Sequence, residues 1–271
     1  MKKNDESGDL QQARSHLRTT LLLLLAALLS MVAASAAWFS IADRAQVKSL
    51  SMDVTAGPAL RFDLDAHKDF EEYTKTLTFQ EIADRVEQDL GYDMKEIPLE
   101  PVTTQDWQTF TYKNGTQAEE KSGVYLTFTL HFCALKDMDV HLTSANSQGN
   151  ADGTSVSSEN EELPQAMRIS FTADGETKVY DPGMDAGSED NVFGLPSASG
   201  MEYNDGNTLF SLKAEEDKEV TVHVWLEGTD EACTDQLKGA DYSIQLRFEG
   251  TDDEGKVFQA ENETNQIEGE T

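Results

Sequence analysis

Hydrophobic and polar residues alternate along much of this chain, and a period of two is typical of β-strands with one buried face. In the segment 122–134 every second residue is apolar: Val124, Leu126, Phe128, Leu130 and Phe132. Shorter runs of the same kind occur at 47–54, 60–64, 167–171, 220–226 and 242–248. The pattern predicts roughly nine to eleven short strands and an all-β fold.

One stretch has a different period. Apolar residues in the second half of Asp69–Leu90 recur at spacings of three, four and seven: Phe79, Ile82, Ala83, Val86 and Leu90. This spacing predicts an amphipathic helix that ends at Gly91, since glycine commonly terminates helices. We therefore expect one helical insertion, 69–91, in the β-domain.

Other segments lack any apolar period. Residues 146–162 and 181–205 are rich in small, polar and acidic residues and are expected to be loops, while 251–271 is expected to be a disordered acidic tail. The remaining strands predict an antiparallel β-sandwich of jelly-roll or Greek-key type over residues 38–250.

The apolar run Leu21–Phe39 has no charged residue and reads LLLLLAALLSMVAASAAWF. As a helix it would extend roughly 28 Å, close to the thickness of a bilayer core. Arg14 and Arg18 precede it, and the next basic residue is Arg44. Because positive charge stays on the cytoplasmic side, this N-terminal hydrophobic helix should place the β-domain outside the cell.

Two interpretations of this helix remain open. Ala34-Ser35-Ala36 and Ser35-Ala36-Ala37 each offer a small-x-small cleavage site, so a signal peptidase would cut near Ala36 or Ala37. Alternatively, residues 1–37 form a cytoplasmic n-region and a retained signal anchor, with Trp38 and Phe39 at the membrane interface. In either case the helix contacts the membrane, at least before cleavage.

The chain is strongly acidic. It contains 21 Lys and Arg against 51 Asp and Glu, a formal net charge of −30. Such a surface repels nucleic acid and anionic lipid, so we expect no nucleic-acid partner. Salt and divalent cations should weaken the repulsion between copies and favour assembly.

Cys133 and Cys233 form a candidate disulfide, because the predicted compartment is oxidising and the cysteine count is even. Their surroundings differ, however, since Cys133 lies in an apolar strand and Cys233 in an acidic loop. The sequence therefore leaves this bridge open.

No motif in the sequence points to catalysis. HExxH, GxSxG, P-loop and CxxC patterns are all missing, and the five histidines are scattered: His16, His67, His131, His141 and His223. We therefore expect a protein that is not an enzyme and carries no cofactor. Calcium is the alternative to plain solvation for two acidic groups, neither of which matches an EF-hand loop: Asp230, Glu231 and Asp235, or Asp181, Asp185, Glu189 and Asp190.

Two stretches resemble a known family. Ala36-Ala37-Trp38-Phe39-Ser40 precedes Val54-Thr55-Ala56-Gly57 and the alternating 60–64, and the segment 222–233 contains the run Trp225-Leu226-Glu227-Gly228 ahead of Cys233. This arrangement is similar to the camelysin/TasA-like proteins, which are exported by Gram-positive bacteria and processed by a SipW-type signal peptidase. The resemblance covers the first exported strands and the last two strands.

The resemblance implies a jelly-roll subunit of the biofilm matrix or cell surface, which in some members forms fibres. In those members the mature N-terminus donates a strand to the next subunit. Here the donor would lie within Trp38–Gln46 and include Trp38, Phe39 and Ile41. Some members carry a metallopeptidase label, which no motif in this sequence supports. The long n-region, the helical insertion and the acidic loops depart from the family pattern and could cap a sheet edge.

The sequence thus leads to three hypotheses. The first is an exported, non-enzymatic surface or matrix protein that associates with itself or with other envelope proteins; in one version of this hypothesis it is a fibre subunit that assembles by N-terminal strand donation. The second is a secreted metal-dependent hydrolase, which would require His131 or His223 to hold zinc. The third is a membrane-anchored ligand-binding module.

Overall fold

The computed structural model describes residues 23–24, 47–54, 59–143, 153–183, 195 and 202–258, with the backbone alone for 47–54. The chain divides into two units, Met1–Asp43 and Arg44–Thr271. In the first, Leu23 and Leu24 are helical and exposed. No helix within the described ranges is both long and apolar enough to cross a membrane.

The second unit is built from strands, as the sequence predicted. Its two sheets run mostly antiparallel. Sheet A has the order β11-β7-β13-β1-β3, with β8 also paired to β13: β11 Thr208–Leu212, β7 Met138–Leu142, β13 Tyr242–Thr251, β1 Val47–Val54, β3 Thr76–Leu77 and β8 Ser155–Ser158. Sheet B joins β10-β9-β12 to β6-β2 and to β4-β5: β10 Glu176–Tyr180, β9 Met167–Ala173, β12 Lys218–Glu227, β6 Leu126–Ala134, β2 Leu60–Asp63, β4 Pro101–Thr104 and β5 Phe110–Thr111.

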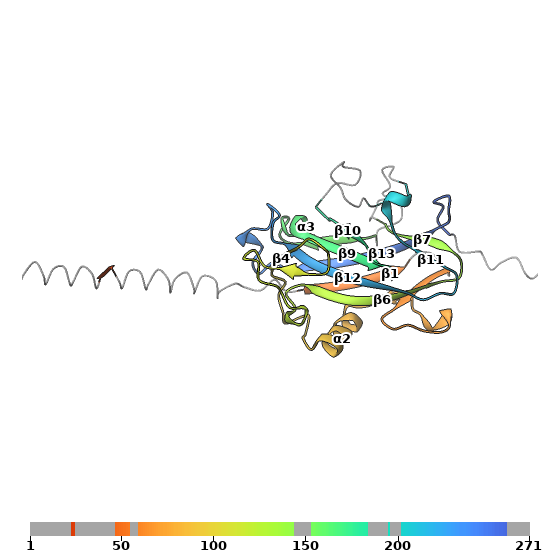
Figure 1. Ribbon diagram of the computed structural model, residues 1–271, viewed down its shortest axis with the longest axis horizontal. Coiled ribbons are helices and arrows are strands. Elements are labelled where there is room, and N and C mark those ends of the chain that lie inside the picture. Colours follow the sequence, from red (N-terminus) through yellow and green to blue (C-terminus); the bar gives the residue numbers. More distant parts are fainter. Residues whose placement is uncertain are drawn as a thin grey trace, which may run out of the picture. The chain divides into compact units, whose positions relative to one another are not determined.

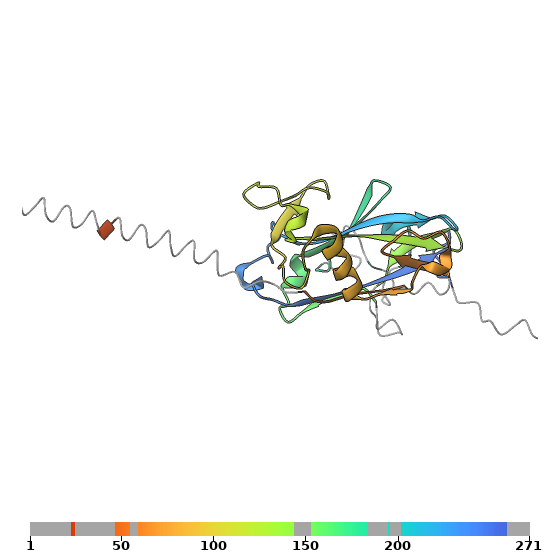
Figure 2. The ribbon, with the colours of Figure 1, turned by 90° about the horizontal axis from the view of Figure 1, so that it is seen from below.

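The two sheets pack face to face, and Figure 2 shows them as two layers. Phe248 of sheet A lies against three aromatic rings of sheet B, with centroid distances of 6.0 Å to Phe62, 5.0 Å to Phe132 and 5.9 Å to Phe171. All four rings are buried. The inward residues of the alternating segments thus form one core, as the period of two predicted.

Two strand pairs are parallel, which alternation alone does not predict. β1 runs parallel to β13, and β4 runs parallel to the end of β12. An alternating pattern fixes which residues face the core, but it carries no information on the direction of the neighbouring strand.

The inserted helix is shorter than predicted. α2 spans Phe79–Leu90, whereas the preceding residues form a short 3₁₀ turn, Phe70–Glu72, and β3. Thr78 caps the helix by accepting a hydrogen bond from the Glu81 backbone, and Glu81 in turn accepts from the Thr78 backbone at 2.7 Å. Gly91 ends the helix with φ of 83°.

The predicted boundaries of loops and tail also shift. The expected loop 146–162 contains β8, which pairs with the first half of β13, and is followed by the short helix α3, Leu163–Ala166. β13 continues to Thr251, which bridges to Val257, so the folded domain extends beyond residue 250. Residues 259–271 lie outside the described chain.

One lateral side of the sandwich is covered, and we call it the closed side. α2 contacts β1 of sheet A and β6 of sheet B, and its buried face consists of Ile82, Ala83 and Val86. The chain also crosses there from β2 to β3, and Phe62 and Thr74 exchange two backbone hydrogen bonds of 2.9 and 3.0 Å. Figure 1 shows α2 along this side of the domain.

The other lateral side, which we call the open side, consists of the edge strands β10 and β11. Each is the last strand of its sheet within the described chain. The two sheets therefore end here in adjacent strands of five residues each.

Candidate interaction surfaces

The first strand lies inside sheet A. β1 pairs with β13 through seven residue pairs, from Val47 opposite Tyr242 to Val54 opposite Phe248. Its other side pairs with β3 at Met52 and Asp53. β1 therefore supplies the backbone hydrogen-bond partner along one edge of β13, whose other edge pairs with β8 and β7.

The residues predicted to be cleaved or donated precede this strand. Ala36, Ala37, Trp38, Phe39 and Ile41 all lie outside the described residues. The predicted donor segment ends at Gln46, immediately before β1 begins at Val47. A donated N-terminus would therefore continue directly into β1.

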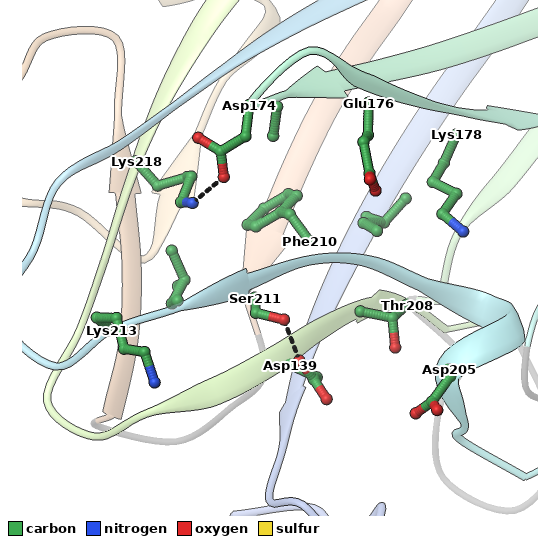
Figure 3. Close-up of a pocket in the computed structure, with 13 residues that line it drawn as sticks. Asp139, Asp174, Glu176, Lys178, Asp205, Thr208, Phe210, Ser211, Lys213 and Lys218 are labelled. Carbon is green, nitrogen blue, oxygen red and sulfur yellow. Dashed lines mark hydrogen bonds and ion pairs between the residues drawn. The ribbon is translucent and has the colours of Figure 1, made fainter.

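A cleft of about 520 Å³ separates β10 from β11 on the open side (Figure 3). An ion pair between Lys218 and Asp174 lies at one end, and Ser211 of β11 donates to Asp139 at 2.5 Å. Glu176 and Lys178 of β10 also line the cleft. The cleft is thus mixed in charge, although the whole chain is strongly acidic.

His131 forms part of a network on the closed side. Its Nδ1 lies 2.9 Å from Asp217, whose other carboxylate oxygen accepts a hydrogen bond of 2.7 Å from the Tyr73 hydroxyl. Tyr73 also accepts a hydrogen bond from the His67 backbone at 2.9 Å. The network attaches the β2–β3 connection to the start of β12. Burial, followed by the bond to Asp217, raises the pKa of Tyr73 to about 12.

His141 and His223 are buried in separate places. The His141 ring lies 2.9 Å from the Asn207 side-chain oxygen and 3.0 Å from the Thr251 hydroxyl. His223 lies between aromatic rings on the outer face of sheet B, 5.3 Å from Phe110 and 6.0 Å from Tyr125 between centroids. Burial lowers the pKa of His223 to about 4.

The histidines do not converge on a common point. His131 lies opposite Glu219 and His223 opposite Thr127, so four residue positions separate the two along β6 and β12. That is roughly 13 Å, whereas zinc ligands each lie about 2 Å from one ion. Within the described ranges no group of three or more His, Cys, Asp or Glu could hold a metal ion.

The calcium candidates already contact basic side chains. The guanidinium of Arg168 lies 2.5 Å from Asp230 and 2.9 Å from Asp181, and Lys238 lies 2.9 Å from Asp235. Glu231 is exposed, and the loop candidates Asp185, Glu189 and Asp190 lie outside the described residues. Because Asp230 is 62 positions from Arg168, no local sequence signal could have predicted this pairing.

The two cysteines are free thiols. Cys133 follows Phe132, which lies opposite Lys218 at the start of β12, whereas Cys233 follows the other end of that strand. The length of β12 places them roughly 30 Å apart, and a disulfide needs Cα atoms within about 7 Å. The candidate bridge within one chain is therefore not formed. Burial raises the pKa of both thiols, that of Cys233 to about 11.

The chain matched no family model, no curated protein and no solved structure. The resemblance to camelysin/TasA-like proteins therefore stays a prediction from the residues that carry it.

Proposed function

We propose that this chain is an exported, non-enzymatic protein of the cell surface or biofilm matrix. Its jelly-roll domain associates with further copies, or with other envelope proteins, through sheet strands. The observation that carries this proposal is the position of β1, which directly follows the predicted donor segment and pairs along β13.

Exchange of β1 between copies needs no new fold. A strand of identical sequence from a second copy offers β13 the same backbone groups, so the hydrogen bonds within sheet A keep their number. The connection from β1 to β2 contains Gly57-Pro58, which favours a turn and a break between the strands. Donation from each copy to the next is head-to-tail and generates an open fibre.

Net charge sets the conditions for such assembly. At −30 per chain, copies repel one another over about 10 Å at 0.1 M salt, and the range shortens as salt increases. Assembly should therefore increase with ionic strength, unlike an association that depends on opposite charges across a surface.

The test compares three purified lengths by sedimentation and electron microscopy. Residues 38–271 should form multimers that grow with salt, and residues 55–271, which lack β1, should not assemble head-to-tail. Residues 47–271 keep β1 and lack the predicted donor segment 38–46. They should still assemble if β1 is the exchanged strand, and should stay monomeric if segment 38–46 is the donor. Monomers of 38–271 at all salt and calcium concentrations would contradict the proposal.

The cleft favours a second candidate, a membrane-anchored ligand-binding module. Its volume of about 520 Å³ lies within the range of small-molecule sites, roughly 300–1,000 Å³. This alternative predicts that the protein stays in the membrane fraction at full length, whereas a processed matrix protein leaves it.

A further inference from the structure

The free edge of β10 presents unpaired backbone groups. Asp174 and Gly175 connect β9 to β10 in a two-residue turn with φ of 52° and 81°, as in a type I′ hairpin. The pair that closes such a turn, Ala173 and Glu176, is hydrogen-bonded. Thr177 and Val179 therefore direct their N–H and C=O groups away from β9, and in the described chain β10 pairs with no other strand.

The side chains along this edge alternate in charge. Glu176 and Lys178 are two positions apart, so both point to the same face of the strand, and both line the cleft. Neither has an ion-pair partner among the described residues. The strand thus carries one negative and one positive side chain, symmetric about Thr177.

We propose that β10 pairs antiparallel with β10 of a second copy of this chain, with Thr177 opposite the partner's Thr177. In this register Glu176 lies opposite the partner's Lys178, and the same pair occurs again across the two-fold axis. The outward groups of Thr177 form the central hydrogen-bonded pair. A register centred on Lys178 would instead oppose two lysines, which is unfavourable.

The edge of β11 is less suited to pairing. Its register with β7 shifts between Thr208 and Phe210, and such irregularities bend a strand away from a partner. Charged side chains of one sign on an edge strand also discourage pairing with a second copy. On β10, however, Glu176 and Lys178 have opposite charges, which lie opposite each other when the strand pairs with itself. β10 is therefore the strand of the open side that fits a second copy.

This contact is independent of strand donation. β10 lies at the edge of sheet B, whereas β1 lies inside sheet A. A five-residue edge buries little surface, so the contact alone is weak, and it gains strength where many copies are already aligned. Sheet B then becomes continuous between two copies, which would link neighbouring fibres sideways.

The test traps the pair covalently in the full chain. Thr177→Cys in a Cys233→Ser background places two thiols opposite each other, with Cα atoms about 5.5 Å apart, within reach of a disulfide. The remaining Cys133 is 4% exposed and should not react. We expect a disulfide-linked dimer on a non-reducing gel after mild oxidation.

Charge reversal in this background decides the register. Glu176→Lys or Lys178→Glu alone should lower the dimer yield about tenfold, because each opposes like charges twice. The double reversal should restore it. Lys113→Glu, an exposed site on another turn, matches the charge change of Lys178→Glu and should leave the yield unchanged.

Three results would overturn the inference: no dimer from Thr177→Cys with native far-UV circular dichroism, equal dimer yields in all four charge variants, or a rise with Glu176→Lys. The last is what net charge alone predicts, since this substitution makes the chain less acidic. Because the dimer is read directly, the result stands whether or not β1 is donated.

Discussion

The two lateral sides of the sandwich differ in how the sheets end. On the closed side α2 lies against both sheets. The β2–β3 connection pairs with the edge of β2 through the two backbone hydrogen bonds between Phe62 and Thr74. On the open side β10 and β11 end the sheets next to a cleft with charged residues. The first side combines the buried apolar face of α2 with the Tyr73–Asp217–His131 network, whereas the second presents charged residues around a cleft.

Because of this difference, we expect the closed side to determine the stability of the monomer and the open side to determine association between copies. Residues of the closed side are buried in the monomer, so their replacement should change the free energy of unfolding. Glu176 and Lys178 of the open side have no ion-pair partner in the described chain, so their replacement should change binding between copies. Substitutions on each side test this division when both the free energy of unfolding and the association between copies are measured.

The largest effect is expected on the closed side. Ile82 of α2 is fully buried, and Ile82→Ala should lower the free energy of unfolding by about 3–4 kcal/mol, measured by urea titration. Glu87→Ala on the exposed face of the same helix should change it by less than about 0.5 kcal/mol. Equal effects of the two would mean that α2 does not cover the sheets.

The next effect concerns the covered outer face of sheet B. The pKa of His223 falls from 6.5 to about 4 on folding, so the unfolded chain binds more protons between these values. The contribution of neutral His223 to the free energy of unfolding is fully present above pH 6.5 and is lost as the pH falls towards 4. The loss is at most about 3 kcal/mol. On acidification from pH 7 to pH 4, the His223→Leu variant should lose less of its free energy of unfolding than the natural chain loses.

A smaller effect is expected from the Tyr73 network. Tyr73→Phe removes the hydroxyl that donates to Asp217 and should cost about 2 kcal/mol at pH 7. The pKa of Tyr73 is raised from 10 to about 12, so its contribution is full below pH 10 and is lost as the pH rises through 12. The stability difference between the two proteins should therefore shrink across this range. A constant difference would contradict this role of the hydroxyl.

The smallest effect on stability is expected on the open side. Lys178→Ala should change the free energy of unfolding by less than about 0.5 kcal/mol, because Lys178 has no ion-pair partner in the described chain. The same variant should weaken the trapped Thr177→Cys dimer. A large loss of stability would show that the open side supports the monomer.

The sequence predicted the strands with strong alternation, because these depend on local patterns. It missed β3, which has two residues, and β8, which consists of serines and one valine. It placed the start of the helix too early, although Thr78 and Glu81 carry the spacing of a capping box and could have located it.

The candidate surfaces were less predictable. The parallel pairing of β1 with β13 joins residues nearly two hundred positions apart, and no local pattern encodes it. The contacts of Arg168 with Asp181 and Asp230 and of Tyr73 with Asp217 likewise arise only after the sheets form. To predict the open side, one must know which strands end each sheet, and strand order is a property of the whole fold.

The central claim is that β1 of one copy completes sheet A of another. Ser51 lies opposite Gln245 in the β1–β13 register, so cysteines at both positions of residues 38–271 can be oxidised under assembling conditions. Donation predicts a ladder of disulfide-linked multimers on a denaturing gel. The ladder should disappear when the second cysteine is placed at position 243 and not at position 245. Crosslinks confined to single chains at every salt concentration would contradict the claim.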